Sequence, residues 1–103
     1  MKRFEAAEKV RKYKEKLVSL QMKLNKIEKT CSYRDEEHFG FYKSMIESSI
    51  EHLEYQLFCL EVSIESLEDY VEGERLLEEV KYSEGFMKPV IKEINGLIKE
   101  SVK

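Results

Sequence analysis

The longest heptad pattern in the chain lies at residues 46–71, which read IESSIEHLEYQLFCLEVSIESLEDYV. Aliphatic residues recur there at alternating spacings of four and three, at Ile46, Ile50, Leu53, Leu57, Leu60, Ile64, Leu67 and Val71. A period of about 3.5 residues places these side chains in one stripe along an α-helix, which is typical of helices that pack side by side. We predict a long helix over about residues 40–72, with a start open between 36 and 41 and with Gly73 as its C-terminal stop.

A second apolar stripe precedes this one. It has the same alternating spacing and consists of Ala6, Val10, Tyr13, Leu17, Leu20, Leu24 and Ile27. The residues between them are mostly Lys, Glu, Arg and Gln, which favour helices, and we predict a helix over about residues 3–30. The pattern stops in a turn at about residues 31–39, where Ser32 or Asp35 can cap the next helix.

The C-terminal part has a weaker pattern. Apolar residues at 76, 77 and 80 predict a short helix over about residues 74–83. After Gly85, a broad apolar face predicts a last helix over about residues 87–102, with Pro89 tolerated in its first turn. The sequence therefore predicts one all-α domain over residues 1–103. Its expected form is an antiparallel, coiled-coil-like helical hairpin with a shorter C-terminal helical region, together making a small bundle.

The two long stripes can be aligned in one antiparallel register. If the numbers of facing residues add to 70, the layers are Ala6–Ile64, Val10–Leu60, Tyr13–Leu57, Leu17–Leu53, Leu20–Ile50 and Leu24–Ile46. The centre of this register is residue 35, which lies in the predicted turn. A connection this short makes consecutive helices antiparallel neighbours, so the sequence predicts that the two long helices fold onto each other.

The composition excludes several other classes. Four glycines and one proline among 103 residues are too few for a many-stranded sandwich or barrel, which needs a turn about every 8–12 residues. No apolar run approaches the roughly 20 residues that cross a bilayer, and the start, MKRFEAAEKV, has no apolar secretory segment. We therefore expect a cytoplasmic protein that does not enter a membrane, with Cys31 and Cys59 as reduced thiols.

The formal net charge of −3 hides a strong asymmetry along the chain. Residues 1–34 have a charge balance of +7, residues 35–84 of −12 and residues 85–103 of +2. Strips of like charge flank the apolar stripes, with Lys9, Lys16 and Lys23 on the first helix and Glu47, Glu54, Glu61 and Glu68 on the second. We expect these strips on opposite edges of the hairpin, either as a solvated rim or as contacts between two molecules.

The sequence shows no catalytic or metal-binding pattern. Asp35 and His38 could share a metal ion, but two ligands do not make a site. Cys31 and His38 could act as nucleophile and base, but no third residue is placed to orient them. The chain also has no glycine-rich phosphate loop, G-x-S-x-G or CxxC motif. We expect no enzymatic activity, no cofactor and no bound metal.

Apolar residues outside the stripes indicate a binding function. Tyr55, Phe58 and Val62 lie off the stripe of the second long helix and need a cover, for which we expect the last helix or, alternatively, a second copy of the chain. We predict a dimerising helical adaptor or regulator, of a kind found in bacteria or phages, that binds and modulates another protein. The predicted contact residues are Tyr55, Phe58, Val62, Glu61 and Glu65.

Two alternatives remain open from the sequence. A basic helix that leads into a heptad stripe is a known layout for DNA binding, and it suggests a regulator associated with DNA or RNA. The residues that would contact nucleic acid are Arg3, Lys9, Arg11, Lys12 and Lys16. Glutamates at 5, 8 and 15 interrupt this basic segment, which makes it a weaker match. The other alternative is a scaffold or assembly component.

Overall fold

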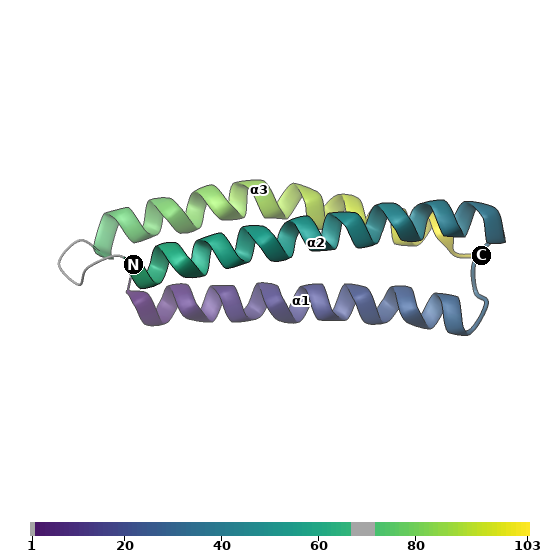
Figure 1. Cartoon of the computed structure of the whole chain (residues 1–103), viewed down its shortest axis with the longest axis horizontal. Coiled ribbons are helices and arrows are strands. Elements are labelled where there is room, and N and C mark those ends of the chain that lie inside the picture. The colour runs from purple at the N-terminus through teal and green to yellow at the C-terminus, as the bar shows by residue number, and fades with distance from the viewer. Residues whose placement is uncertain (1, 67–71) are drawn as a thin grey trace.

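The structure, a computed structural model, describes residues 2–66 and 72–103. These residues form three α-helices, α1 (Arg3–Lys29), α2 (Glu36–Ser66) and α3 (Glu72–Ser101). The helices alternate in direction and lie side by side in an elongated bundle that measures 54 × 18 × 16 Å (Figure 1). The prediction of an all-α helical hairpin extended into a small bundle is confirmed.

Both predicted apolar stripes form the core of the hairpin. Every stripe residue from Ala6 to Ile27 and from Ile46 to Ile64 is buried, and burial of each large aliphatic side chain is worth roughly 1.5–3 kcal/mol. The last two residues of the longer stripe, Leu67 and Val71, lie outside the described residues, as does Glu68 of the acidic strip.

Contacts between α1 and α2 agree with an antiparallel register close to the predicted one. Lys43 Nζ lies 2.6 Å from Glu28 Oε2, and Lys14 forms an ion pair with Glu61. The residue numbers in these two pairs add to 71 and 75, close to the predicted 70. The individual layers of the predicted alignment remain predictions.

α1 ends in a Schellman motif. The backbone N–H of Ser32 donates to the carbonyl of Ile27 at 3.0 Å, and the N–H of Cys31 donates to the carbonyl of Glu28 at 3.3 Å. This geometry places Cys31 in the left-handed region, with φ of 52°. Glycine is the usual residue at this position because it has no Cβ to clash there, so Cys31 holds the motif at a conformational cost.

We expect Cys31→Gly to raise the free energy of unfolding by about 0.5–1 kcal/mol, because glycine adopts the left-handed conformation without the Cβ clash. Urea denaturation followed by circular dichroism measures this change. Cys31→Ala is the matched control, since it removes the thiol and keeps the Cβ. Equal stabilisation by both substitutions would show that the thiol, and not the backbone conformation, carries the cost.

α2 begins at Glu36, at the early end of the range 36–41 that the sequence left open. Asp35 caps the helix, because its Oδ1 accepts from the backbone N–H of Glu37 at 2.9 Å and of His38 at 3.4 Å. Of the two predicted caps, Asp35 is therefore the one used. Gly40 lies inside α2 and does not mark its start.

α3 corrects the prediction for the C-terminal part. One continuous helix of 30 residues replaces the predicted short helix at 74–83 and the separate helix at 87–102. Gly73 lies inside this helix, so it does not act as the stop of α2. With 30 residues against 31 in α2, the C-terminal region is also not short.

A serine and two helix breakers explain this error. Ser83 is buried in the core between Val80 and Met87, so the apolar pattern looks interrupted although its spacing continues. Gly85 and Pro89 lie well inside α3, not at the start of a new helix. Both are exposed, so water can satisfy the Gly85 carbonyl, which has no N–H partner on Pro89. Packing of the apolar face therefore outweighs local helix propensity here.

The end of α3 is joined to the turn between α1 and α2. The backbone N–H of Arg34 donates to the carbonyl of Ser101 at 3.0 Å, and the N–H of Lys103 donates to the carbonyl of Ser32 at 3.1 Å. Arg34 Nε also donates to the carbonyl of Val102 at 2.7 Å. These bonds fix the position of α3 along the hairpin and satisfy backbone groups of both segments.

Candidate interaction surface

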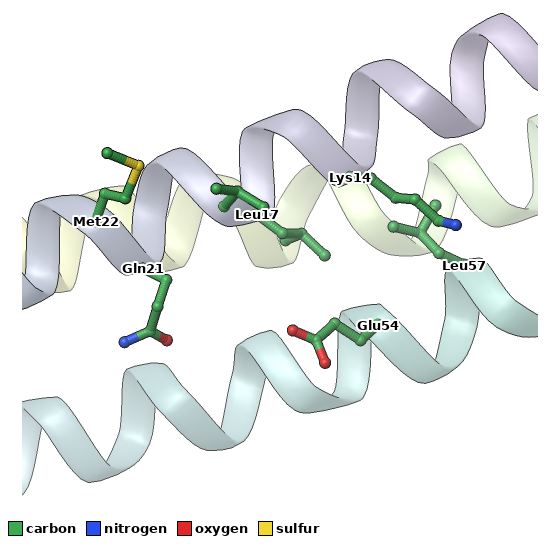
Figure 2. Close-up of a pocket in the computed structure, with 7 residues that line it drawn as sticks. Lys14, Leu17, Gln21, Met22, Glu54 and Leu57 are labelled. Carbon is green, nitrogen blue, oxygen red and sulfur yellow. The ribbon is translucent and has the colours of Figure 1, made fainter.

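The side of the hairpin that faces away from α3 carries a groove between α1 and α2. One hollow of about 410 Å³ is lined by Lys14, Leu17, Val18, Gln21, Met22, Glu54 and Leu57. A second hollow of about 340 Å³ is lined by Ala7, Val10, Arg11, Lys14, Glu61, Ile64 and Glu65. All these residues belong to α1 and α2, and Figure 2 shows α3 behind the pair. We call the two hollows, which share Lys14, the open groove.

Exposed apolar side chains adjoin the open groove on both helices. On α1, Val18 is 60% exposed and Met22 is 64% exposed. On α2, Phe58 is 61% exposed and lies one turn after Glu54, with Tyr55 at 66% and Val62 at 48% beside it on the outer surface. We call these five residues the apolar rim. Val18 and Met22 line the groove itself, and exposed apolar side chains beside a groove are typical of a binding surface.

The rim corrects the expectation that the last helix covers Tyr55, Phe58 and Val62. α3 folds back as expected but packs on the other edge of the hairpin, and these three side chains stay exposed. Of the two covers that the sequence suggested, α3 is therefore excluded by the structure.

The side chains along the two edges of α2 explain this choice. The edge next to α3 carries the half-buried, uncharged residues Ser49, Gln56, Cys59 and Ser63. The opposite edge carries Glu47, Glu54 and Glu61, whose carboxylates would lose hydration beneath a third helix. α3 therefore packs on the edge that it can cover without removing these carboxylates from water.

The predicted contact residues all lie on α2. Glu61 and Glu65 line the open groove, while Tyr55, Phe58 and Val62 lie beside it on α2. Glu61 is paired with Lys14 across the groove. Sequence reasoning missed the contribution of α1, although Val18 and Met22 are large apolar residues outside its stripe and could have indicated it.

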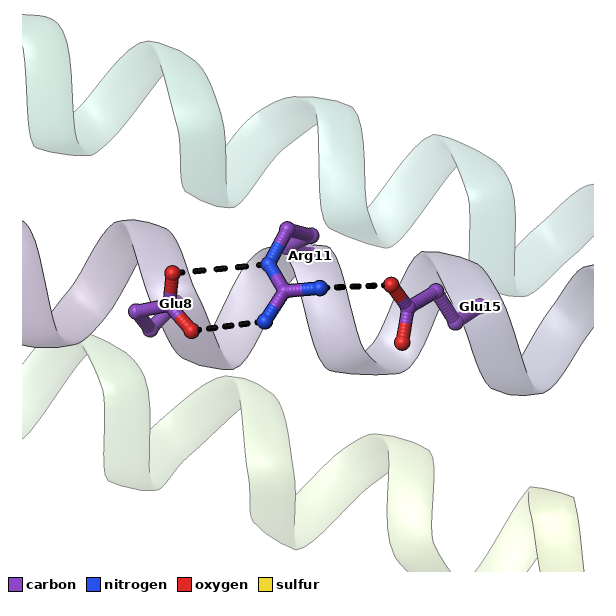
Figure 3. A network of polar contacts seen from close by, with 3 residues as sticks. All are labelled: Glu8, Arg11 and Glu15. Carbon is purple, nitrogen blue, oxygen red and sulfur yellow. Dashed lines mark hydrogen bonds and ion pairs between the residues drawn. The ribbon is translucent and has the colours of Figure 1, made fainter.

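Arg11 and Lys9, which are predicted nucleic-acid contacts, are engaged within the chain. Arg11 lies between two carboxylates of α1, with Nη2 2.8 Å from Glu8 Oε2 and Nη1 2.6 Å from Glu15 Oε1 (Figure 3). The hydrogen bond from Arg11, and then its charge, lower the pKa of Glu8. Lys9 Nζ lies 3.1 Å from Glu84 Oε1 on α3, so this lysine contacts its own chain.

The other predicted basic contacts also lie on α1. Lys12 and Lys16 line a hollow of about 300 Å³ between α1 and α3, together with Lys9, Lys88 and Glu84. Lys16 Nζ lies 5.4 Å from the centre of the Tyr13 ring. Arg3 is half-buried at the start of α1. The basic strip thus lies next to α3 and the acidic strip lies on the open groove, which confirms that they occupy opposite edges.

Glu84 is the central polar residue of the contact between α1 and α3, and the sequence reasoning missed it. Its carboxylate accepts from the Tyr13 hydroxyl at 2.7 Å and from Lys9 at 3.1 Å, and Lys88 Nζ lies 3.4 Å away. A buried tyrosine in a core position needs a partner for its hydroxyl, and this was the signal in the sequence.

This environment changes the pKa values of both partners. Partial burial raises the pKa of Glu84, but the bonds from Tyr13 and Lys9 and the charges of Lys9 and Lys88 outweigh it and hold the pKa below the usual range. Burial, followed by the bond to Glu84, raises the pKa of Tyr13. The carboxylate and the neutral phenol are therefore the stable forms at neutral pH.

The residues considered for chemistry at the turn serve local structure. Asp35 Oδ2 lies 3.2 Å from His38 Nδ1, while Oδ1 caps α2. Bonds from the His38 ring, the His38 N–H and the Glu37 N–H lower the pKa of Asp35. Cys31 and Cys59 are free thiols. Within residues 2–66 and 72–103, no three His, Cys, Asp or Glu side chains are grouped as a metal site would require.

Comparisons with known proteins do not assign this chain to a family. No protein-family model matches the chain, and no curated protein or solved structure is significantly similar to it. Among the described residues, no helix has the length and apolar character needed to cross a membrane.

We expect Tyr13→Phe and Glu84→Gln each to lower the free energy of unfolding by about 1.5–3 kcal/mol at pH 7, because each removes a bond to a partly buried carboxylate. The pKa of Glu84 is lowered on folding, so its contribution is complete above the ordinary carboxyl pKa and is lost as the pH falls through the folded-state value. Urea denaturation at pH 7 and pH 3 measures both effects.

The difference between the native chain and Glu84→Gln should therefore shrink at pH 3. Lys99→Gln, which changes a charge on the exposed surface of α3, serves as the control and should have little effect at either pH. A Glu84→Gln deficit that is the same at both pH values would contradict a role for the ionised carboxylate.

Proposed function

We propose that the protein is a non-catalytic protein-interaction module and that the open groove with its apolar rim is the contact surface. The observation that carries this proposal is a groove lined by α1 and α2 and not by the chain's own third helix, with the exposed side chains of Val18 and Met22 in its wall and exposed Phe58 one turn after Glu54. Exposure of apolar side chains to water is unfavourable, and a partner that covers them lowers the free energy of the complex.

The residues around the rim define the chemistry of the partner. Glu54, Glu61 and Glu65 line the α2 side of the groove, so the partner must offer apolar side chains flanked by basic groups. The central apolar residues would supply most of the binding energy, and the glutamates would select the partner. Acting as an adaptor or regulator in the cytoplasm is the finer role that we propose for such a module.

A second candidate, nucleic-acid binding, is supported by a specific placement of lysines. Lys88 of α3 joins Lys9, Lys12 and Lys16 of α1 around one hollow. The engagement of Lys9 by Glu84 and of Arg11 by two glutamates weakens this candidate, because both cations are already partly neutralised. We therefore rank it second.

A photoreactive benzophenone amino acid at position 58 tests the first candidate. In cells that naturally contain the protein, irradiation should give a specific protein adduct at position 58 and the same adduct at position 22 across the groove. Glu61→Lys with Glu65→Lys should reduce both adducts, because the basic groups of the partner are then repelled.

The control position is Tyr82, which is 75% exposed on α3 and lies away from the groove. Equal adducts at positions 58 and 82, or no protein adduct at position 58, would contradict the proposed surface.

If the second candidate were correct, the protein would retard DNA or RNA in gels at low salt. The apparent affinity would then fall steeply between about 50 and 200 mM salt, and Lys12→Glu with Lys16→Glu would abolish it. Glu93→Gln, which leaves the lysine cluster unchanged, is the control. Our first proposal predicts instead that no retardation occurs even at low salt.

A further inference from the structure

We propose that a second copy of this chain occupies the open groove. The two copies are related by a two-fold axis parallel to the helices, so that α1 of each copy lies against α2 of the other. This inference rests on the proposed function, because it names the partner of the same surface.

The distribution of charge supports this occupant. Within its bounds α1 carries nine Lys and Arg against four Glu, whereas α2 carries one Lys against seven Glu. On the open groove itself, the α1 side carries Arg11 and Lys14, and the α2 side carries Glu54, Glu61 and Glu65. The basic partner chemistry that the acidic side requires is present on α1 of the same protein, so the surface is complementary to itself.

The same charges select the direction of the axis. An axis parallel to the helices places the basic side of one copy against the acidic side of the other. An axis across the helices, in the plane of the interface, places α1 against α1 and α2 against α2, so Glu54 and Glu61 would face the glutamates of the other copy. Like charges facing each other in an interface disfavour that second arrangement.

A stable dimer has to use most of the face that contains the groove. The bundle is 54 Å long and 18 Å wide, so one whole face has a projected area of roughly 1,000 Å², and about four-fifths of it must be buried to reach the roughly 800 Å² that each partner buries in a typical stable interface. The arrangement also closes on itself, because each copy uses the same surface. It therefore gives a dimer and not a growing assembly.

Positions along the helices predict specific neighbours across the interface. Lys14 and Leu57 line the same hollow and so lie at the same height along the hairpin. With the parallel axis, Phe58 of one copy comes beside Lys14 of the other, where a cation–π contact can form. Val18 and Glu54 also share this hollow, so Val18 of one copy comes beside Glu54 of the other.

Sedimentation of the purified full chain tests the occupant. We expect a species of twice the 12.3 kDa chain mass at micromolar concentration. Phe58→Glu should weaken the association at least about tenfold, because it places a carboxylate in the apolar centre of the contact. Tyr82→Glu, the matched change of an exposed aromatic residue on α3, should have no effect. A native chain that is monomeric at about 100 μM, or a dimer unaffected by Phe58→Glu, overturns the proposal.

Charge-reversal variants test the complementarity. Arg11→Glu with Lys14→Glu makes the groove acidic on both sides, and Glu61→Lys with Glu65→Lys makes it basic on both sides. Each variant alone should be monomeric, and an equimolar mixture should form the mixed dimer. Circular dichroism confirms that both remain helical. A variant that still forms a homodimer, or a mixture that stays monomeric, overturns the charge argument.

Single cysteines test the axis in chains whose Cys31 and Cys59 are replaced by serine. Mixing Val18→Cys chains with Glu54→Cys chains should give a mixed disulfide dimer under mild oxidation. Val18→Cys alone should give little product, because the two cysteines then lie on the two α1 helices, which do not face each other across the parallel axis. Efficient disulfide formation by Val18→Cys alone, without the mixed product, overturns the parallel axis.

Failure of this inference is distinguishable from failure of the proposed function. A monomeric chain that still forms an adduct with a different protein through position 58 rejects the second copy and keeps the interaction surface. A chain that is monomeric and forms no adduct at position 58 rejects both. An adduct at position 58 that consists of two copies of this chain supports both.

Discussion

The glutamates along one edge of α2 constrain the whole bundle, because their carboxylates would lose hydration beneath α3, whose packed face is apolar. α3 therefore packs on the other edge, where Ser49, Gln56 and Ser63 are uncharged and small enough to be half-buried. This packing leaves a groove on the glutamate side, with apolar side chains beside it that the chain does not cover. The position of the third helix and the location of the candidate binding surface thus have one physical cause.

Two polar contacts hold α3 in this position. Near the middle of α1, Glu84 accepts from Tyr13 and Lys9 and so joins α3 to the first helix. At the C-terminal end of α3, backbone hydrogen bonds between the α1–α2 turn and the last residues of the chain fix the position of α3 along the hairpin. Apolar burial supplies most of the stability, but a uniform apolar stripe does not fix the position of one helix along another. Directed hydrogen bonds are what select one axial position.

The predicted fold was accurate where a strong periodic pattern existed and inaccurate where local signals competed with packing. The stripes of α1 and α2 gave the hairpin because buried aliphatic residues at this spacing have few alternatives. Ser83, Gly85 and Pro89 suggested a break in α3, but its apolar face continues past them and packs on the hairpin. For the candidate site, all the predicted α2 residues lie on or beside the groove. The α1 side of it was missed because Val18 and Met22 were not considered apart from the stripe.

Apolar spacing and charge order along the chain specify an antiparallel pair of helices, one basic and one acidic, because these features depend on local sequence and on a short turn. Whether Tyr55, Phe58 and Val62 are core or surface depends on which edge of the hairpin the third helix selects. The edge is selected by contacts between residues of α2 and α3 that are far apart in the chain. Burial of glutamates on one edge would cost more free energy than burial of serine and glutamine on the other. The choice of edge is settled when the three helices pack together, and with it the face that is left for a partner.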